Sequence, residues 1–120
     1  MPVLLFKPHH MTKELSPKEV YAGVILEFGI ENQKKMLHEE IGELLSALNK
    51  YDRGRVNDEA VITEIADVMI MLEQMAFIFG EEEVEAEKER KLQRLLDRLI
   101  KHLRNKKKEK ENKKTDDREF

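Results

Sequence analysis

Two stretches of sequence decide the fold: residues 36–50, MLHEEIGELLSALNK, and residues 59–80, EAVITEIADVMIMLEQMAFIFG. In the first, apolar side chains recur at the helical period, so one face of a helix is predicted to be buried. In the second, apolar residues occur almost all round the helix, which indicates a central position or a subunit interface. Turn-forming residues 51–55 lie between them, so we expect two neighbouring helices joined by a loop.

Helix start and stop signals flank these stretches. The segment Ser16-Pro17-Lys18-Glu19 forms a capping box, so a helix is predicted to begin there, and Gly29 is predicted to end it. Gly80 ends the third helix, and a fourth follows with a narrow leucine stripe that stops at Leu103. The predicted fold is therefore all-α and resembles a four-helix bundle. We expect an irregular arm over residues 1–15, a helical domain over 16–103 and a frayed or disordered charged tail over 104–120.

Composition restricts the class of protein. The 120 residues are 40% hydrophobic and 39% charged, which is enough apolar material for one core. There is no cysteine, so any metal must bind oxygen or imidazole. No apolar run is long enough to cross a bilayer, and we expect a cytoplasmic protein without a membrane partner. Of the net charge of −3, residues 101–120 contribute nine Lys and Arg against five Asp and Glu, which leaves −7 for residues 1–100. This acidic body argues against a nucleic-acid partner.

Two pairs of carboxylates mark the candidate site. Glu40 and Glu43 are three residues apart in the first stretch, and Glu64 and Asp67 are three apart in the second. Each pair therefore projects from one side of its helix, within or beside the apolar face. Ionised carboxylates removed from water cost several kcal/mol each unless a cation or hydrogen bonds compensate them. No Lys or Arg is placed to face these pairs, so a metal ion is the predicted counter-charge.

The chemistry of these ligands indicates which metal. Four carboxylates without His or Cys favour Mg²⁺ or Mn²⁺ over zinc or iron, and Mg²⁺ in turn favours a phosphate substrate. Gly42 lies between the two acids of the first pair, where its missing side chain is interpreted as space for metal, water or a close helix.

These motifs resemble the MazG-like family of all-alpha nucleotide pyrophosphohydrolases over roughly residues 33–98. The family pattern EExxE, a spacer and ExxD reads here Glu39-Glu40-Ile41-Gly42-Glu43 and Glu64-Ile65-Ala66-Asp67. The resemblance implies an oligomeric MazG-type fold, a homodimer or homotetramer, that hydrolyses a nucleoside or deoxynucleoside triphosphate to the monophosphate and pyrophosphate. Glu40, Glu43, Glu64 and Asp67 would then be the Mg²⁺ ligands. Glu39 would act with Glu40 and Glu43 in catalysis, by orienting a ligand or accepting a proton from water.

The resemblance also implies substrate contacts outside the carboxylates. Gln33 and Gln74 match positions of polar residues in some members and would contact the substrate. Lys91 and Arg94 resemble basic residues on the family's last helix and would contact phosphate. A structural interpretation stays open for these two cations, since a solvated basic flank gives the same pattern. Two functional alternatives also stay open: a non-catalytic helical dimerisation or regulatory module, and a phosphoribosyl-ATP pyrophosphohydrolase. The sequence does not indicate the base, the sugar or the number of metal ions.

Overall fold

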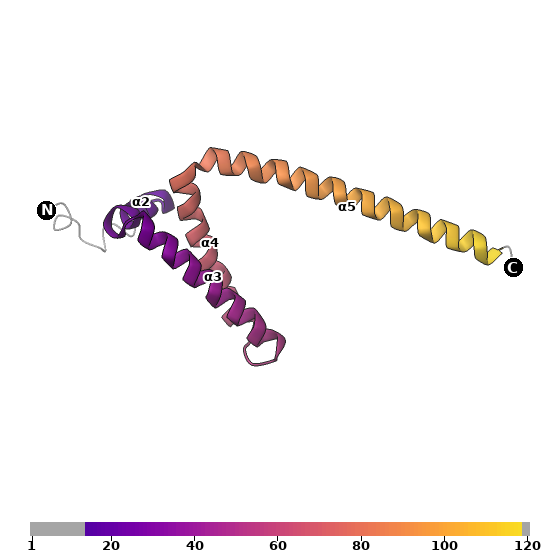
Figure 1. Ribbon diagram of the computed structural model, residues 1–120, viewed down its shortest axis with the longest axis horizontal. Coiled ribbons are helices and arrows are strands. Elements are labelled where there is room, and N and C mark those ends of the chain that lie inside the picture. The colour runs from indigo at the N-terminus through magenta and orange to yellow at the C-terminus, as the bar shows by residue number, and fades with distance from the viewer. Residues whose placement is uncertain (1–13, 119–120) are drawn as a thin grey trace. The chain divides into compact units, whose positions relative to one another are not determined.

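The computed structural model describes residues 14–118, and every regular element in them is a helix (Figure 1). The helices are α2 (Pro17–Phe28), α3 (Ile30–Asp52), α4 (Asp58–Phe79) and α5 (Glu81–Arg118). Within this described part there is no strand, which confirms the all-α class. Residues 1–13 of the predicted irregular arm lie outside the described residues. No helix of residues 14–118 combines the length and apolar character needed to span a membrane.

Local capping signals set the helix ends where the sequence placed them. The Glu19 N–H donates to Ser16 Oγ over 3.3 Å, which is the N-cap bond of the predicted capping box of α2. The Ser16 hydroxyl donates to the Glu19 carboxylate over 3.1 Å, where a capping box has the Ser16 backbone N–H as the donor. At the start of α4, the Ala60 N–H donates to Asn57 Oδ1 over 3.3 Å. Gly29 and Gly80 follow α2 and α4 with φ of 89° and 122°, a backbone conformation that side-chain-bearing residues rarely adopt.

Helices α3 and α4 form an antiparallel hairpin (Figure 1). The loop between them contains only residues 53–57, and so short a connection makes the second helix return along the first. Helix α2 contacts both members of the hairpin. The hydroxyl of Tyr21 on α2 donates a hydrogen bond to the Glu73 carboxylate on α4, which joins the outer helix to the hairpin.

The hairpin buries little apolar surface within one chain. Among the described residues, the buried apolar side chains are Ala47, Val68 and Met71. In contrast, Ile62 on α4 is 62% exposed and Phe79 is 71% exposed. The apolar character that α4 shows all round its surface therefore exceeds what α2 and α3 cover. An exposed apolar surface of this kind is typical of a face that meets another molecule.

The chain divides into two compact units, the first ending at Glu81 and the second beginning at Glu82. Helices α2, α3 and α4 belong to the first unit and almost all of α5 belongs to the second, so the packing of α5 in a four-helix bundle stays a prediction. Helix α5 has 38 residues and continues to Arg118, which corrects the prediction of a frayed or disordered tail after Leu103. Lys and Glu are strong helix formers, so the sequence after Leu103 favours a continued helix although its apolar periodicity has ended.

Candidate metal centre

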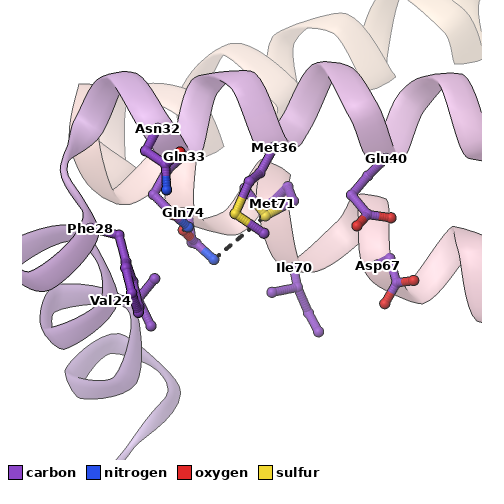
Figure 2. Close-up of a pocket in the computed structure, with 10 residues that line it drawn as sticks. All are labelled: Val24, Phe28, Asn32, Gln33, Met36, Glu40, Asp67, Ile70, Met71 and Gln74. Atoms are coloured by element: carbon purple, nitrogen blue, oxygen red, sulfur yellow. Dashed lines mark hydrogen bonds between the residues drawn. The ribbon is translucent and has the colours of Figure 1, made fainter.

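Three of the four predicted metal ligands come together where α3 and α4 face each other. Glu40, Glu43 and Glu64 each offer a carboxylate oxygen, and these oxygens lie within 4.8 Å of one another. Asp67 lies one helical turn beyond Glu64 on α4 and lines the same cavity as Glu40. Figure 2 shows Glu40 and Asp67 at one end of that cavity, one from each helix. The spacing of three residues on each helix and the antiparallel hairpin together produce this cluster.

The cluster carries negative charge that the protein leaves uncompensated. Glu40 Oε2 and Glu64 Oε2 are buried and have no hydrogen-bond partner. Burial raises the pKa of both carboxyl groups, and the negative charges of Glu43 and Asp67 raise them further. None of the ion pairs within residues 14–118 includes any of these four acids. A cation from outside the described residues would stabilise this cluster in its ionised form.

The donor set fits a hard divalent cation. The three clustered groups are all carboxylates, and two of them have a buried oxygen without a hydrogen-bond partner. A bound cation would compensate the energetic cost of burying these oxygens. Oxygen ligands without His or Cys suit Mg²⁺ and Mn²⁺. Glu40, Glu43 and Glu64 would hold such an ion, and Asp67 is the nearest further acid along α4.

A cavity of about 480 Å³ extends from the acids along the α3–α4 groove to α2. At its far end, Gln33 and Gln74 are buried, with 1% and 4% of their surface exposed. Gln33 Nε2 donates to Gln74 Oε1 over 2.6 Å, and Gln74 Nε2 donates to Met71 Sδ over 3.7 Å (Figure 2). Gln33 Oε1 is buried without a partner. The two predicted substrate-binding glutamines therefore share one cavity with Glu40 and Asp67.

The sequence interpretation treated the two glutamines separately and missed the bond between them. A signal for it was present: Gln33 is seven residues before Glu40 and Gln74 is seven residues after Asp67. In an antiparallel hairpin that pairs Glu40 with Asp67, equal steps in opposite directions bring the glutamines together. The side chains that line the rest of the cavity are mostly apolar: Val24, Phe28, Met36, Ile70 and Met71. The α2 residues in this wall were not predicted as part of the site.

Glu39, Lys91 and Arg94 were also predicted to belong to the site. Glu39 is exposed on α3 and does not belong to the carboxylate cluster. Lys91 and Arg94 are exposed on α5, in the second unit. A Cβ added at Gly42 would meet no atom within 4 Å, so the described chain does not use this glycine for a close helix contact. The space beside Gly42 is open.

Comparison of the chain with protein-family models, with curated proteins and with solved structures found no significant match. Function is therefore inferred from the site itself, in which a cluster of carboxylates without a counter-charge is joined by one cavity to a buried pair of amides.

Proposed function

We propose that this protein is a Mg²⁺- or Mn²⁺-dependent nucleoside triphosphate pyrophosphohydrolase with the MazG-type fold. The observation that carries the proposal is the buried, unpartnered oxygens of Glu40 and Glu64, together with the ligand-sized cavity that Glu40 lines. Buried acids without a counter-charge cost stability, so a protein that keeps them has a use for a cation there. A structural or regulatory helical module has no such need.

The chemistry of a nucleoside triphosphate matches the two ends of the cavity. A triphosphate is strongly negative and cannot approach the four acids unless cations lie between them. A bound divalent cation would supply that charge, orient the phosphate oxygens and lower the pKa of a coordinated water. The cavity volume of about 480 Å³ is in the range of small-molecule sites.

The apolar and amide end of the cavity suits the nucleoside. Met36 and Ile70 offer apolar surface to the faces of a base, and the ring of Phe28 offers a surface for stacking. Gln33 Oε1 lacks a hydrogen-bond partner and can accept one from a base or sugar donor. The Gln74 bond holds the Gln33 amide in position, so the glutamine pair would orient the nucleoside relative to the acids.

The exposed apolar surface of α4 supports an oligomer. Ile62, Met69 and Leu72 are each at least half exposed, which is unusual for so apolar a helix. A homodimer or homotetramer would cover this surface and would let a neighbouring subunit contribute to the cavity. The catalytic role of Glu39 and the phosphate-binding roles of Lys91 and Arg94 stay predictions from the family resemblance.

Metal titration of matched variants tests the proposal. Isothermal titration with Mg²⁺ and with Mn²⁺ should give binding to the natural protein and to Glu59→Gln, an exposed first-turn acid of α4 used as the control. Glu40→Gln and Glu64→Gln should each lose that binding and also lose Mg²⁺-dependent pyrophosphate release. Circular dichroism should confirm that all four proteins are helical. Equal binding and turnover in Glu40→Gln and Glu59→Gln would show that the metal lies elsewhere or serves no catalysis.

A further inference from the structure

Helix α5 carries a single straight seam of side chains that recur at alternating steps of three and four residues. The central part of the seam is four leucines, Leu92, Leu96, Leu99 and Leu103, each 47–54% exposed. Steps of three and four residues are the spacing that two helices need to pack along each other over several turns. These leucines can stabilise the 38-residue helix by burial only when a second surface covers them.

The same seam continues beyond the leucines in both directions, and there it becomes charged. On the N-terminal side it contains Glu82, Glu85 and Glu89, and on the C-terminal side it contains Lys106, Lys110 and Lys113. All six residues keep the alternating steps of three and four. The helix dipole favours acids in the first turn and bases in the last, but most of these residues lie further inside the helix, beyond the reach of that effect.

The seam runs from acidic through apolar to basic residues, so its charges are complementary to those of a second α5 that runs in the opposite direction. If Leu96 faces Leu99 of a second, antiparallel α5, equal outward steps place Leu92 opposite Leu103 in the next layer. The three layers beyond pair Glu89 with Lys106, Glu85 with Lys110 and Glu82 with Lys113, and twofold symmetry repeats all of them. Beside the seam, Lys88 of one helix lies within one turn of the level of Glu109 of the second copy, and these two side chains also have opposite charges.

A parallel arrangement of the same two helices fails on charge. It places each seam glutamate against the same glutamate of the second copy and each seam lysine against the same lysine. Like charges in facing positions oppose association, so the parallel pair has six unfavourable layers where the antiparallel pair has six favourable ones. The pairs that exist within one helix, Lys88 with Glu85 and Arg90 with Glu87, are exposed and readily exchanged for contacts between helices.

We propose that α5 is a self-association element that pairs antiparallel with α5 of a second copy of this chain, with Leu96 and Leu99 at its centre and the Glu and Lys ends of the seam matched. The inference is independent of the proposed catalytic function, because it rests only on α5. Its test measures a distance between two α5 helices and not an activity. A distance produced by association of the copies through the exposed surface of α4 would not respond to charge reversal along α5.

A spin-label distance in the full chain tests the orientation. The chain has no cysteine, so Glu83→Cys gives a single labelling site beside the seam. In the antiparallel pair, each label lies at the level of Asn112 of the other copy, about 29 residues along the helix from the other label, or about 43 Å. A parallel pair would place the two labels at the same level of helices whose axes lie about 8–10 Å apart, so the labels would be within about 20 Å of each other.

Charge reversal on the labelled chain tests the seam. Glu85→Lys with Glu89→Lys makes both ends of the seam basic, and Lys106→Glu with Lys110→Glu makes both ends acidic. Each double variant should lose the distance of about 43 Å when alone, and an equal mixture of the two should regain it. Circular dichroism should show that each remains helical. The proposal is overturned by a distance under about 20 Å, by the absence of any interchain distance in the natural seam, or by a distance that charge reversal leaves unchanged.

Discussion

The bond between Gln33 and Gln74 gives a sharp prediction for stability. Their side chains are 1% and 4% exposed, and Gln33 Nε2 lies 2.6 Å from Gln74 Oε1. Gln33→Leu would leave Gln74 Oε1 buried without a donor. Gln74→Leu would leave both polar atoms of the Gln33 amide unpartnered, since Gln33 Oε1 already has none. The double variant removes the polar atoms of both side chains at once.

The magnitude follows from the cost of a buried polar group without a partner, about 1–3 kcal/mol. We expect each single variant to lower the free energy of unfolding by about 1–2 kcal/mol, after the gain from burying a leucine is included. The double variant should be at least as stable as the natural protein, because it also removes the unpartnered Gln33 Oε1. Because the double variant is expected to lose nothing, the coupling energy equals the sum of the two single losses, about 2–4 kcal/mol.

Urea unfolding of the natural protein and the three variants measures this coupling, and the midpoint should fall for each single variant without a change in the slope. Gln93→Leu is the control, because Gln93 is exposed on α5 and donates only to Asp97 over 3.0 Å, so its substitution should change stability little. Single variants as stable as the natural protein, or effects that simply add in the double variant, would refute the view that these amides depend on each other. Under the proposed function, the double variant should also lose affinity for substrate despite its stability.

Three further predictions follow from the geometry of the first unit. Gly42→Ala should stabilise α3 by about 1 kcal/mol in thermal unfolding, because its Cβ meets no atom within 4 Å; a loss of stability would show that another molecule approaches there. Because the pKa of Glu40 and of Glu64 is raised above 4.5, the folded state holds their protons more tightly, and the metal-free Tm should fall as pH rises through their raised pKa values. Added Mg²⁺ should cancel that fall, and a profile unchanged in Glu40→Gln would contradict the assignment. The hydrogen bond to Glu73, burial and the charge of Glu73 raise the pKa of Tyr21 to about 12, so its stabilising effect should be present below pH 10 and lost as pH rises through about 12. Glu73→Gln should move the phenolate absorbance titration of Tyr21 back toward 10, and no shift would show that the bond does not form.

The sequence predicted the features that depend on neighbouring residues. Ser16 and Asn57 accept hydrogen bonds from backbone groups three residues away, and Gly29 and Gly80 supply unusual backbone angles, so the ends of α2 and α4 are visible in a local pattern. The carboxylate pairs were equally accessible, because a spacing of three residues fixes a common side of a helix before any packing is known.

Features that depend on how helices meet were harder to predict. The Gln33–Gln74 bond requires the antiparallel register of α3 and α4, which no single-helix pattern contains. The contribution of Val24 and Phe28 to the cavity wall requires the position of α2 across the hairpin. For α5, the loss of apolar periodicity after Leu103 was interpreted as the end of the helix, whereas Lys and Glu continue both the helix and its seam to Lys113.

Pyrophosphate release tests the central claim most directly. The natural protein would be incubated with each of the eight standard nucleoside and deoxynucleoside triphosphates, with Mg²⁺, Mn²⁺ or EDTA present, and the products identified as monophosphate and pyrophosphate. We predict release that depends on the metal, favours particular bases or sugars and disappears in Glu40→Gln while Glu59→Gln retains it. No release from any substrate by a helical, metal-supplied protein, or release that persists in EDTA, would contradict the account.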